Sequence, residues 1–191
     1  MIRSFVALEI PGEAVWRLEG AQAGLPCGRP VPSENFHLTL AFLGEHPRPV
    51  IEDVHYALQT IRAPGFSLTL SGVGLFGGGK PTALYAHVLL KPGLLHLREK
   101  VLQAARSAGL RPQNERFVPH ITLARFGSGL RGEDAEKMHG FVATRLDLSG
   151  GPWPVEDFAL FRSRLGKTAS YEALERYPLE TGLPSVAAGA W

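Results

Sequence analysis

An internal repeat constrains the fold of this chain more than any other feature of its sequence. Residues 7–12 (ALEIPG) align with residues 88–93 (VLLKPG), 81 positions later, and both segments lead into apolar residues at helical spacing. A tetrapeptide follows in each copy, HLTL at residues 37–40 and HITL at residues 120–123, 83 positions apart. One β-α-β-α-β plan used twice predicts two similar lobes related by an approximate twofold axis, with the two tetrapeptides facing each other.

The expected strands alternate between apolar and polar residues. This pattern is typical of antiparallel strands with one face against a core, whereas buried parallel strands are apolar throughout. We therefore predict an α+β fold with two lobes about a central cleft, each lobe an antiparallel β-sheet with helices on its outer face. The expected strands cover residues 2–10, 36–43, 66–76, 84–90, 120–126, 158–162 and 171–179, and the expected helices cover residues 13–25, 51–61, 94–110 and 133–142.

The chain is expected to form a single bilobal domain over residues 1–191, with the repeat at roughly 1–80 and 82–180. Hydrophobic residues make up 45% of the chain and charged residues 20%, which suits a globular protein and excludes a disordered one. The last segment, 181–191, is rich in small residues with Pro and Gly, and we expect a loosely held tail.

The sequence lacks the features of membrane and disulfide-bonded proteins. It contains no run of about 18 apolar residues, and its apolar start is too short for a signal peptide. Cys27 is the only cysteine, which excludes an intramolecular disulfide and a multi-cysteine zinc site. We expect a monomer in the reducing cytoplasm.

Basic residues are concentrated in the middle of the chain. Residues 61–131 carry a net charge of +8, whereas residues 1–60 and 132–191 each carry −3. Fifteen of the twenty basic residues are arginines, whose planar fork suits phosphate. A solvated basic surface and a surface that faces a polyanion both fit this pattern, and charge alone leaves both open.

The tetrapeptides place two histidines and two threonines where they can act together. Residues i and i+2 of a strand share a face, so His37 lies beside Thr39 and His120 beside Thr122. Two imidazoles with ordinary pKa values near 6.5 can be held one protonated and one neutral, the acid and base needed to break a phosphodiester without a metal. The threonine hydroxyls can donate to the non-bridging phosphate oxygens.

Longer segments around these residues resemble one family. NFHLTLAFLGE (residues 35–45) and FVPHITLARF (residues 117–126) resemble the paired motifs of the two-histidine (2H) phosphoesterase superfamily, in particular the RNA 2′,3′-cyclic phosphodiesterases also called 2′-5′ RNA ligases. The opening RSFVALEIP and the closing residues 158–179 are similar to the ends of that family.

The resemblance implies a function and a set of roles. It implies metal-independent hydrolysis of RNA 2′,3′-cyclic phosphate ends to 2′-phosphomonoesters, with reversible 2′-5′ RNA ligation as an additional activity and no cofactor. By matching position, His37 would be the proton donor and His120 the proton acceptor, which the symmetry of the repeat alone does not assign. The partner would be an RNA or nucleotide with a cyclic phosphate terminus.

Arg125 occupies the position where the second motif of the family often carries a phosphate-binding arginine. Strict alternation from His120 puts Arg125 on the opposite face of the strand, so a bulge or a twist at the strand end is needed to bring it to the phosphate. Among the aromatic residues, Phe42, Phe126 and Tyr171 could stack a base, but packing in the core is the favoured interpretation.

Other motifs in the sequence point to alternative sites and functions. Residues 74–80 match all but the last position of a phosphate-binding P-loop, but Pro81 replaces the required Ser or Thr, so a hairpin is expected. The remaining histidines show no metal-ligand spacing. The rival functions are a non-catalytic RNA- or nucleotide-binding module on the same fold, and a 2H phosphodiesterase for another cyclic or 2′-5′-linked nucleotide.

Overall fold

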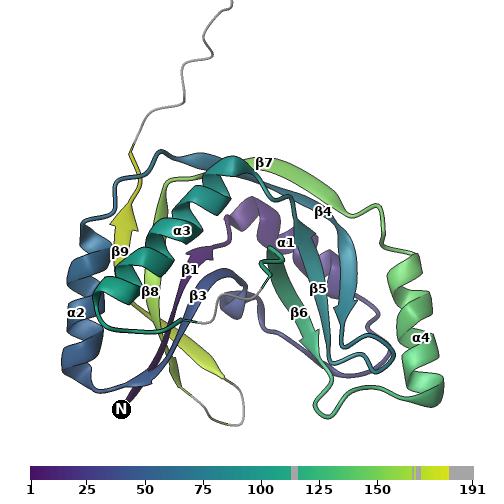
Figure 1. Ribbon diagram of the computed structural model, residues 1–191. Coiled ribbons are helices and arrows are strands. Elements are labelled where there is room, and N and C mark those ends of the chain that lie inside the picture. The colour runs from purple at the N-terminus through teal and green to yellow at the C-terminus, as the bar shows by residue number, and fades with distance from the viewer. Residues whose placement is uncertain (113–115, 165, 167–168, 181–191) are drawn as a thin grey trace, which may run out of the picture.

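The computed structural model describes residues 1–112, 116–164, 166 and 169–180, and the expected tail 181–191 lies outside the described residues. The strands form one sheet in the order β7-β4-β5-β6-β3-β1-β8-β9, and the short β2 pairs with β6 (Figure 1). Every pairing between these strands is antiparallel. The strands are β1 (Ile2–Glu9), β2 (Arg29–Pro30), β3 (His37–His46), β4 (Phe66–Phe76), β5 (Ala83–Val88), β6 (His120–Arg125), β7 (Ser149–Val155), β8 (Asp157–Arg164) and β9 (Ser170–Pro178).

The sheet consists of two halves that meet at a narrow junction between β3 and β6. One half is β3-β1-β8-β9 and the other is β6-β5-β4-β7, and the ladder between them contains the pair Leu38–Ile121. Read outward from this junction, β3 corresponds to β6, β1 to β5 and β8 to β4. The two tetrapeptides therefore meet at the centre of the molecule, as the repeat predicted.

Each repeat contributes to both halves of the sheet. The first repeat supplies β1 and β3 to one half, but its last strand, β4, pairs with β5 in the other half. In the second repeat β8 likewise crosses over and pairs with β1. Each lobe is thus assembled from both repeats, with β4 of the first repeat and β8 of the second as the inner strands that cross over.

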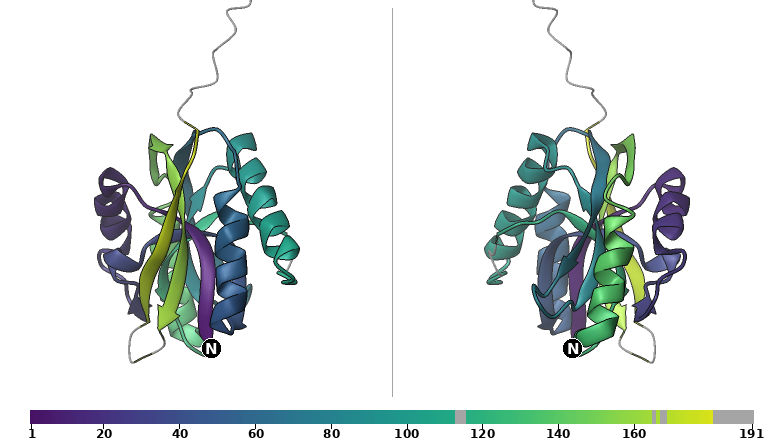
Figure 2. Two further views of the ribbon diagram at one scale, coloured as in Figure 1. Left: turned by 90° about the vertical axis from the view of Figure 1, so that its left-hand side faces the viewer. Right: turned by 90° about the vertical axis from the view of Figure 1, so that its right-hand side faces the viewer.

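The helices lie on the outer faces of the two halves (Figure 2). Helices α2 (Arg48–Gln59) and α3 (Pro92–Ser107) pack together and contact β9 and β3, while α1 (Gly12–Gln22) contacts β6 and β7. Helix α4 (Gly132–Ala143) lies near the end of α1, where Nη2 of Arg145 donates to the carbonyl oxygen of Ala23 at 2.7 Å. This arrangement confirms the predicted two-lobed α+β fold. No helix within the described ranges is long and apolar enough to cross a bilayer.

One loop segment departs from the sequence-based expectation, and the P-loop-like segment agrees with it. The proline-rich segment before β3, where no strand or helix was expected, contains β2 and a short 3-10 helix, η1 (Ser33–Asn35). Its backbone is held to β6, because the N–H of Val31 donates to the carbonyl oxygen of Leu123 at 2.8 Å. The P-loop-like residues 74–80 lie in the β4–β5 hairpin and precede no helix, as expected.

Candidate active site

The central strands β3 and β6 divide their side chains between the core and the opposite face of the sheet. Leu38, Leu40, Ile121 and Leu123 are at most 2% exposed. The side chains between them, His37, Thr39, His120 and Thr122, are half-buried and lie on the other face. In an antiparallel ladder the pair Leu38–Ile121 places His37 opposite Thr122 and His120 opposite Thr39. The structure therefore brings both predicted histidines and both threonines together.

The two imidazoles are oriented by the same backbone contact. Nδ1 of His37 lies 2.7 Å from the carbonyl oxygen of Asn35, and Nδ1 of His120 lies 2.7 Å from the carbonyl oxygen of Val118. A carbonyl oxygen only accepts, so each Nδ1 must carry the hydrogen and donate it. Each neutral ring therefore keeps its lone pair on Nε2, and either Nε2 can accept a proton or, once protonated, return it.

A β-bulge in β6 brings Arg125 to the same face of the sheet as His120. The β5–β6 register shifts by one residue between the pairs Tyr85–Thr122 and Leu84–Ala124, so Leu123 is the extra residue in β6. Leu123 and Ala124 are both buried, and Arg125 returns to the face that carries His120 and Thr122. Of the two alternatives that the sequence left open, a bulge or a twist at the strand end, the structure shows the bulge.

Strand β3 has a bulge at the equivalent position. Its register with β1 shifts between the pairs Ala7–Thr39 and Val6–Ala41, so Leu40 is the extra residue. The residue that returns to the cleft face here is Phe42, which is 67% exposed. The duplicated motif thus ends in an arginine at one end of the cleft and in an aromatic ring at the other.

The electrostatic environment disfavours the charged form of both imidazoles. Burial is the main cause that lowers the pKa of His37 and of His120 below the ordinary value, and the hydrogen bonds to the carbonyl oxygens of Asn35 and Val118 partly oppose it. The positive charge of Arg125 lowers the pKa of both rings further. One guanidinium therefore acts on both histidines.

Aromatic rings surround each histidine. The His37 ring lies 4.8 Å from Phe5 and 5.0 Å from Tyr171, centroid to centroid. The His120 ring lies 4.7 Å from Phe76 and 5.5 Å from Tyr85, with both contacts edge-on. These rings account for the burial that lowers the pKa values of the histidines.

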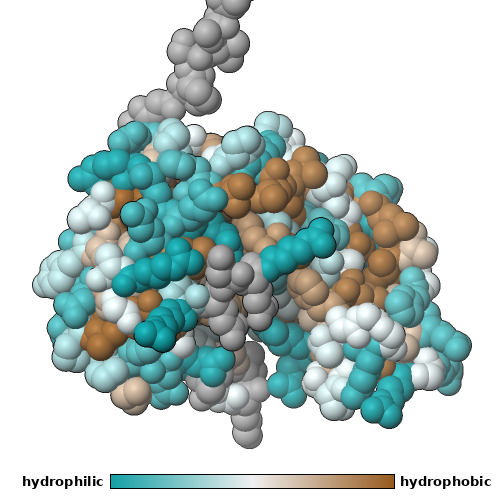
Figure 3. Space-filling view, in the orientation of Figure 1, coloured by the Kyte–Doolittle hydropathy of each residue, from teal (hydrophilic) through white to brown (hydrophobic). Residues whose placement is uncertain are grey.

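Two pockets share Asn35 and Tyr171 in their linings, and His37 lines one of the two. One, of about 390 Å³, is lined by residues of β1, α1, η1, β8 and β9, including His37 itself, Glu34 and Phe161. The other, of about 230 Å³, is lined by residues that include Arg29 and Arg125. Asn35 and Tyr171 line both pockets and form the wall between them. The two lobes are separated along the lower edge of the molecule (Figure 3).

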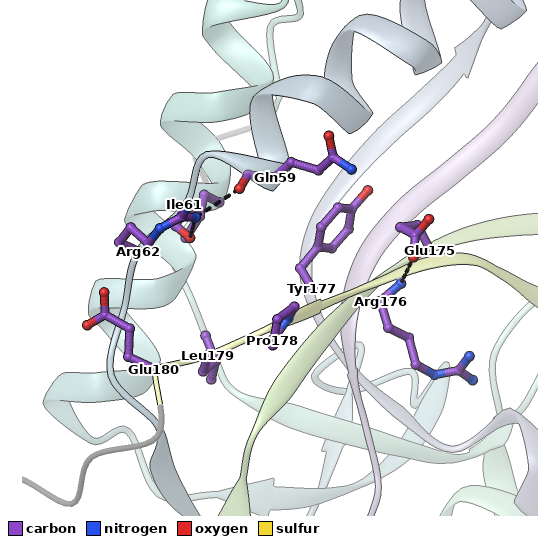
Figure 4. A pocket seen from close by; sticks show the side chains of 9 residues that line it. All are labelled: Gln59, Ile61, Arg62, Glu175, Arg176, Tyr177, Pro178, Leu179 and Glu180. Atoms are coloured by element: carbon purple, nitrogen blue, oxygen red, sulfur yellow. Dashed lines mark hydrogen bonds between the residues drawn. The ribbon is translucent and has the colours of Figure 1, made fainter.

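A further cavity of about 520 Å³ lies away from the tetrapeptides, between the end of α2 and β9 (Figure 4). Its lining mixes acidic and basic side chains, including Arg62, Glu175 and Glu180, and none of the predicted site residues belongs to it. Within the described ranges, no group of three or more His, Cys, Asp and Glu side chains is arranged to hold a metal ion.

The aromatic residues considered as base platforms have three different environments. Phe126 is 7% exposed and belongs to the core, as the favoured interpretation held. That interpretation is wrong for Phe42, because the bulge in β3 turns its ring out of the core. Tyr171 packs on the outside of a small cluster of Phe5, Phe161 and alanines, next to His37.

Comparison with known proteins agrees with this geometry. The sequence profile of the 2′-5′ RNA ligase superfamily matches residues 13–167, which is most of the chain. The chain belongs to the 2′-5′ RNA ligase superfamily. The family resemblance inferred from the paired motifs is thereby confirmed.

Individual members of this superfamily match over nearly the whole chain. An RNA 2′,3′-cyclic phosphodiesterase of Geobacillus stearothermophilus is 32% identical over 182 residues, covering 92% of this chain and 56% of that protein. One from Escherichia coli strain K12 is 31% identical over 186 residues, covering 93% and 96%. The crystal structure of E. coli LigT complexed with 3′-AMP matches with a TM-score of 0.72 at 28% identity, covering 93% of this chain and 98% of that one. The chain thus spans little more than half of the Geobacillus protein.

Sequence reasoning missed the groups that orient and surround the histidines. The carbonyl groups of Asn35 and Val118 belong to the backbone, and no residue type marks them. His87 and Tyr85 were also missed. Nε2 of His87 lies 3.3 Å from the Tyr85 hydroxyl, and its charge contributes to lowering the pKa of His120. The one available signal was that residues 85 and 87 share the cleft face of the strand next to β6.

Proposed function

We propose that this protein hydrolyses RNA 2′,3′-cyclic phosphate ends to 2′-phosphomonoesters by a metal-independent mechanism, with reversible 2′-5′ RNA ligation on the same site. The observation that carries the proposal is the matched pair of imidazoles. Both donate from Nδ1 to a carbonyl oxygen two residues upstream, so both keep Nε2 for proton transfer on one face of the sheet. The names of the relatives from G. stearothermophilus and E. coli support the same reaction.

In the proposed reaction His120 is the base and His37 is the acid. His120 Nε2 takes a proton from water as the water oxygen attacks phosphorus. The bond from phosphorus to O3′ breaks, and protonated His37 gives its Nε2 proton to the departing O3′. The product carries the phosphate on O2′ and a free 3′-hydroxyl, and each histidine ends in the protonation state in which the other began.

Thr39, Thr122 and Arg125 would hold the phosphate during this step. The hydroxyls lie on the same face as the imidazoles and can donate to the non-bridging oxygens, where negative charge increases in the transition state. The Arg125 guanidinium can add charge-assisted hydrogen bonds. Its influence on the pKa values of both histidines supports a position near the centre of the site.

The partner in this proposal is an RNA or nucleotide that ends in a cyclic phosphate. The E. coli LigT structure contains 3′-AMP, a nucleotide, and this supports the substrate class. We further propose that the protein acts as a monomer in the cytoplasm. Its single cysteine, which excludes an intramolecular disulfide, supports the reducing location. The internal repeat, with the crossing of β4 and β8 between halves, supports a single bilobal domain.

Substitution of each histidine tests the assignment. His37→Ala and His120→Ala should each lower kcat for 2′,3′-cyclic AMP by at least about 10²-fold, the usual contribution of a general acid or base. The double variant should be scarcely worse than the poorer single variant, because the two groups act as a unit. Near-normal turnover by either variant, with its circular dichroism spectrum intact, would refute the acid-base pair.

A further inference from the structure

The two histidines share one backbone contact, but the side chains of the residues that provide it differ. The carbonyl groups of Asn35 and Val118 occupy equivalent places, two residues before His37 and His120. Asn35 is only 8% exposed, and Val118 is half-buried. A buried amide needs hydrogen-bond partners, whereas a valine side chain needs none. The polar side chain at position 35 is therefore an asymmetry in an otherwise duplicated arrangement.

The Asn35 side chain connects η1 to the beginning of β9. Its Nδ2 donates to the carbonyl oxygen of Ala169 at 2.9 Å, a contact between parts of the chain 134 residues apart. Tyr171 follows two residues later, and its ring lies edge-on to His37 at 5.0 Å with an angle of 81° between the rings. The backbone of Asn35 thus contacts His37, and its side chain contacts the residue that immediately precedes β9, the strand that carries Tyr171.

We propose that Asn35 is a positioning residue that holds the beginning of β9 against His37, so that Tyr171 covers the imidazole and separates the two pockets beside it. The proposal deepens the proposed function, because it concerns the histidine assigned as the acid. Asn35 and Tyr171 line both pockets, so the same hydrogen bond fixes the wall that a bound nucleotide would meet. The pocket with Arg29 and Arg125 lies on one side of this wall, and the pocket with His37 on the other.

The surroundings of His37 determine what loss of this hydrogen bond would do. Tyr171 faces the ring from β9, Phe5 faces it from β1, and Arg125 and His120 act on it from β6. Glu9 is its neighbour across the β1–β3 ladder, and that carboxylate is paired with Arg176.

Burial is the largest cause of the lowered pKa of His37. Release of Tyr171 would admit water to the ring and raise that pKa toward its ordinary value. The His120 ring, whose aromatic neighbours are Phe76 and Tyr85, would keep its environment.

Asn35→Ala tests the proposal, because the carbonyl group of residue 35 and its bond to His37 remain in the variant. The pKa values of His37 and His120 are measured together by proton NMR of the ring Cε1–H signals in the free protein. We expect the pKa of His37 to rise and that of His120 not to rise, because the charge of His37 can only disfavour the charged form of His120. We also expect KM for 2′,3′-cyclic AMP to rise at least about fivefold, the lower bound for losing one buried hydrogen bond, with a smaller change in kcat.

Two further variants separate positioning from a general loss of stability. Val118→Ala is the matched control at the equivalent position, and it should leave the pKa of His37 unchanged. Tyr171→Ala removes the covering ring and leaves the Asn35–Ala169 hydrogen bond in place, and it should raise the pKa of His37 as Asn35→Ala does. The double variant should add little to either single change, because both act through one contact.

An unchanged pKa of His37 in both Asn35→Ala and Tyr171→Ala would overturn the proposal, as would equal shifts of His37 and His120. The NMR titration requires no turnover. A protein that fails to hydrolyse the cyclic phosphate would therefore refute the proposed function without affecting this result.

Discussion

The orientation of each catalytic candidate depends on the residue two positions before it. A strand places His37 and Thr39 on one face, and this much follows from the side-chain period. The tautomer follows from a carbonyl group whose direction is set where the chain enters the strand, in η1 for His37 and before β6 for His120. Sequence analysis could therefore identify the reacting side chains, but the groups that hold their rings became visible only in the structure.

The threonine hydroxyls offer a test at the same scale. Thr39→Val and Thr122→Val remove a donor while keeping the shape of the side chain. Each should cost about 1.5–3 kcal/mol of transition-state stabilisation, the range for a hydrogen bond to a charged group, measured as the ratio of kcat/KM values. If both variants kept the kcat/KM of the parent protein, the hydroxyls would have a structural role only.

Arg125 links phosphate binding to the pH dependence of activity. Its positive charge disfavours the imidazolium form of His37 and His120, so its removal should raise both pKa values. The bell-shaped pH profile of kcat/KM reports the coupled pair in the free protein, and its limbs in the parent protein should lie below the ordinary histidine range.

In Arg125→Gln both limbs of this profile should move to higher pH, and KM should rise more than kcat falls. Arg62→Gln, at an exposed arginine between α2 and β4, is the control for a change in net charge. Limbs that stay in place or move to lower pH in Arg125→Gln would contradict the assigned position of the guanidinium.

At the scale of elements, the residue pattern predicted strands and helices but did not locate the bulges within the strands. Alternation along residues 66–76 predicted β4 with its observed bounds, and apolar spacing predicted the buried face of α2 that contains Ile51, Val54 and Leu58. The position of Arg125 required a bulge or a twist in β6 without locating it, and nothing in the sequence required the bulge at Leu40 in β3. A bulge is a property of the register between two strands, and one strand's sequence does not contain that register.

The β3–β6 junction predicts a marked loss of stability on truncation. Ile121 is 1% exposed and pairs with Leu38, which is fully buried. Ile121→Ala should lower the free energy of unfolding by about 2–5 kcal/mol, measured from the urea midpoint and slope. Leu89→Ala, at a residue that is 44% exposed, should change it by no more than about 0.5 kcal/mol. A loss below about 1 kcal/mol at Ile121 would mean that the junction contributes little to the packing.

At the scale of the whole molecule, duplication explains both the symmetry of the site and its departures from symmetry. Two copies of one plan bring His37 and His120 together at the axis, and this relation could be predicted from the 83-residue spacing of the tetrapeptides. The exchange of β4 and β8 between halves could not be predicted. The order of strands and helices along the chain is the same whether each of these strands stays with its own repeat or crosses to the other half. The two copies differ at equivalent positions, where the second copy has Arg125 in place of Phe42 and Val118 in place of Asn35.

The most direct test of the proposed reaction is turnover of 2′,3′-cyclic AMP in excess EDTA, followed by phosphorus NMR. The two-histidine mechanism predicts full activity under chelation and a product with the phosphate on O2′ only, because O3′ is the oxygen that departs. The same reaction with the His37→Ala/His120→Ala double variant gives the background rate. Loss of turnover in EDTA with recovery on adding zinc or manganese, or accumulation of the 3′-phosphate, would contradict the mechanism.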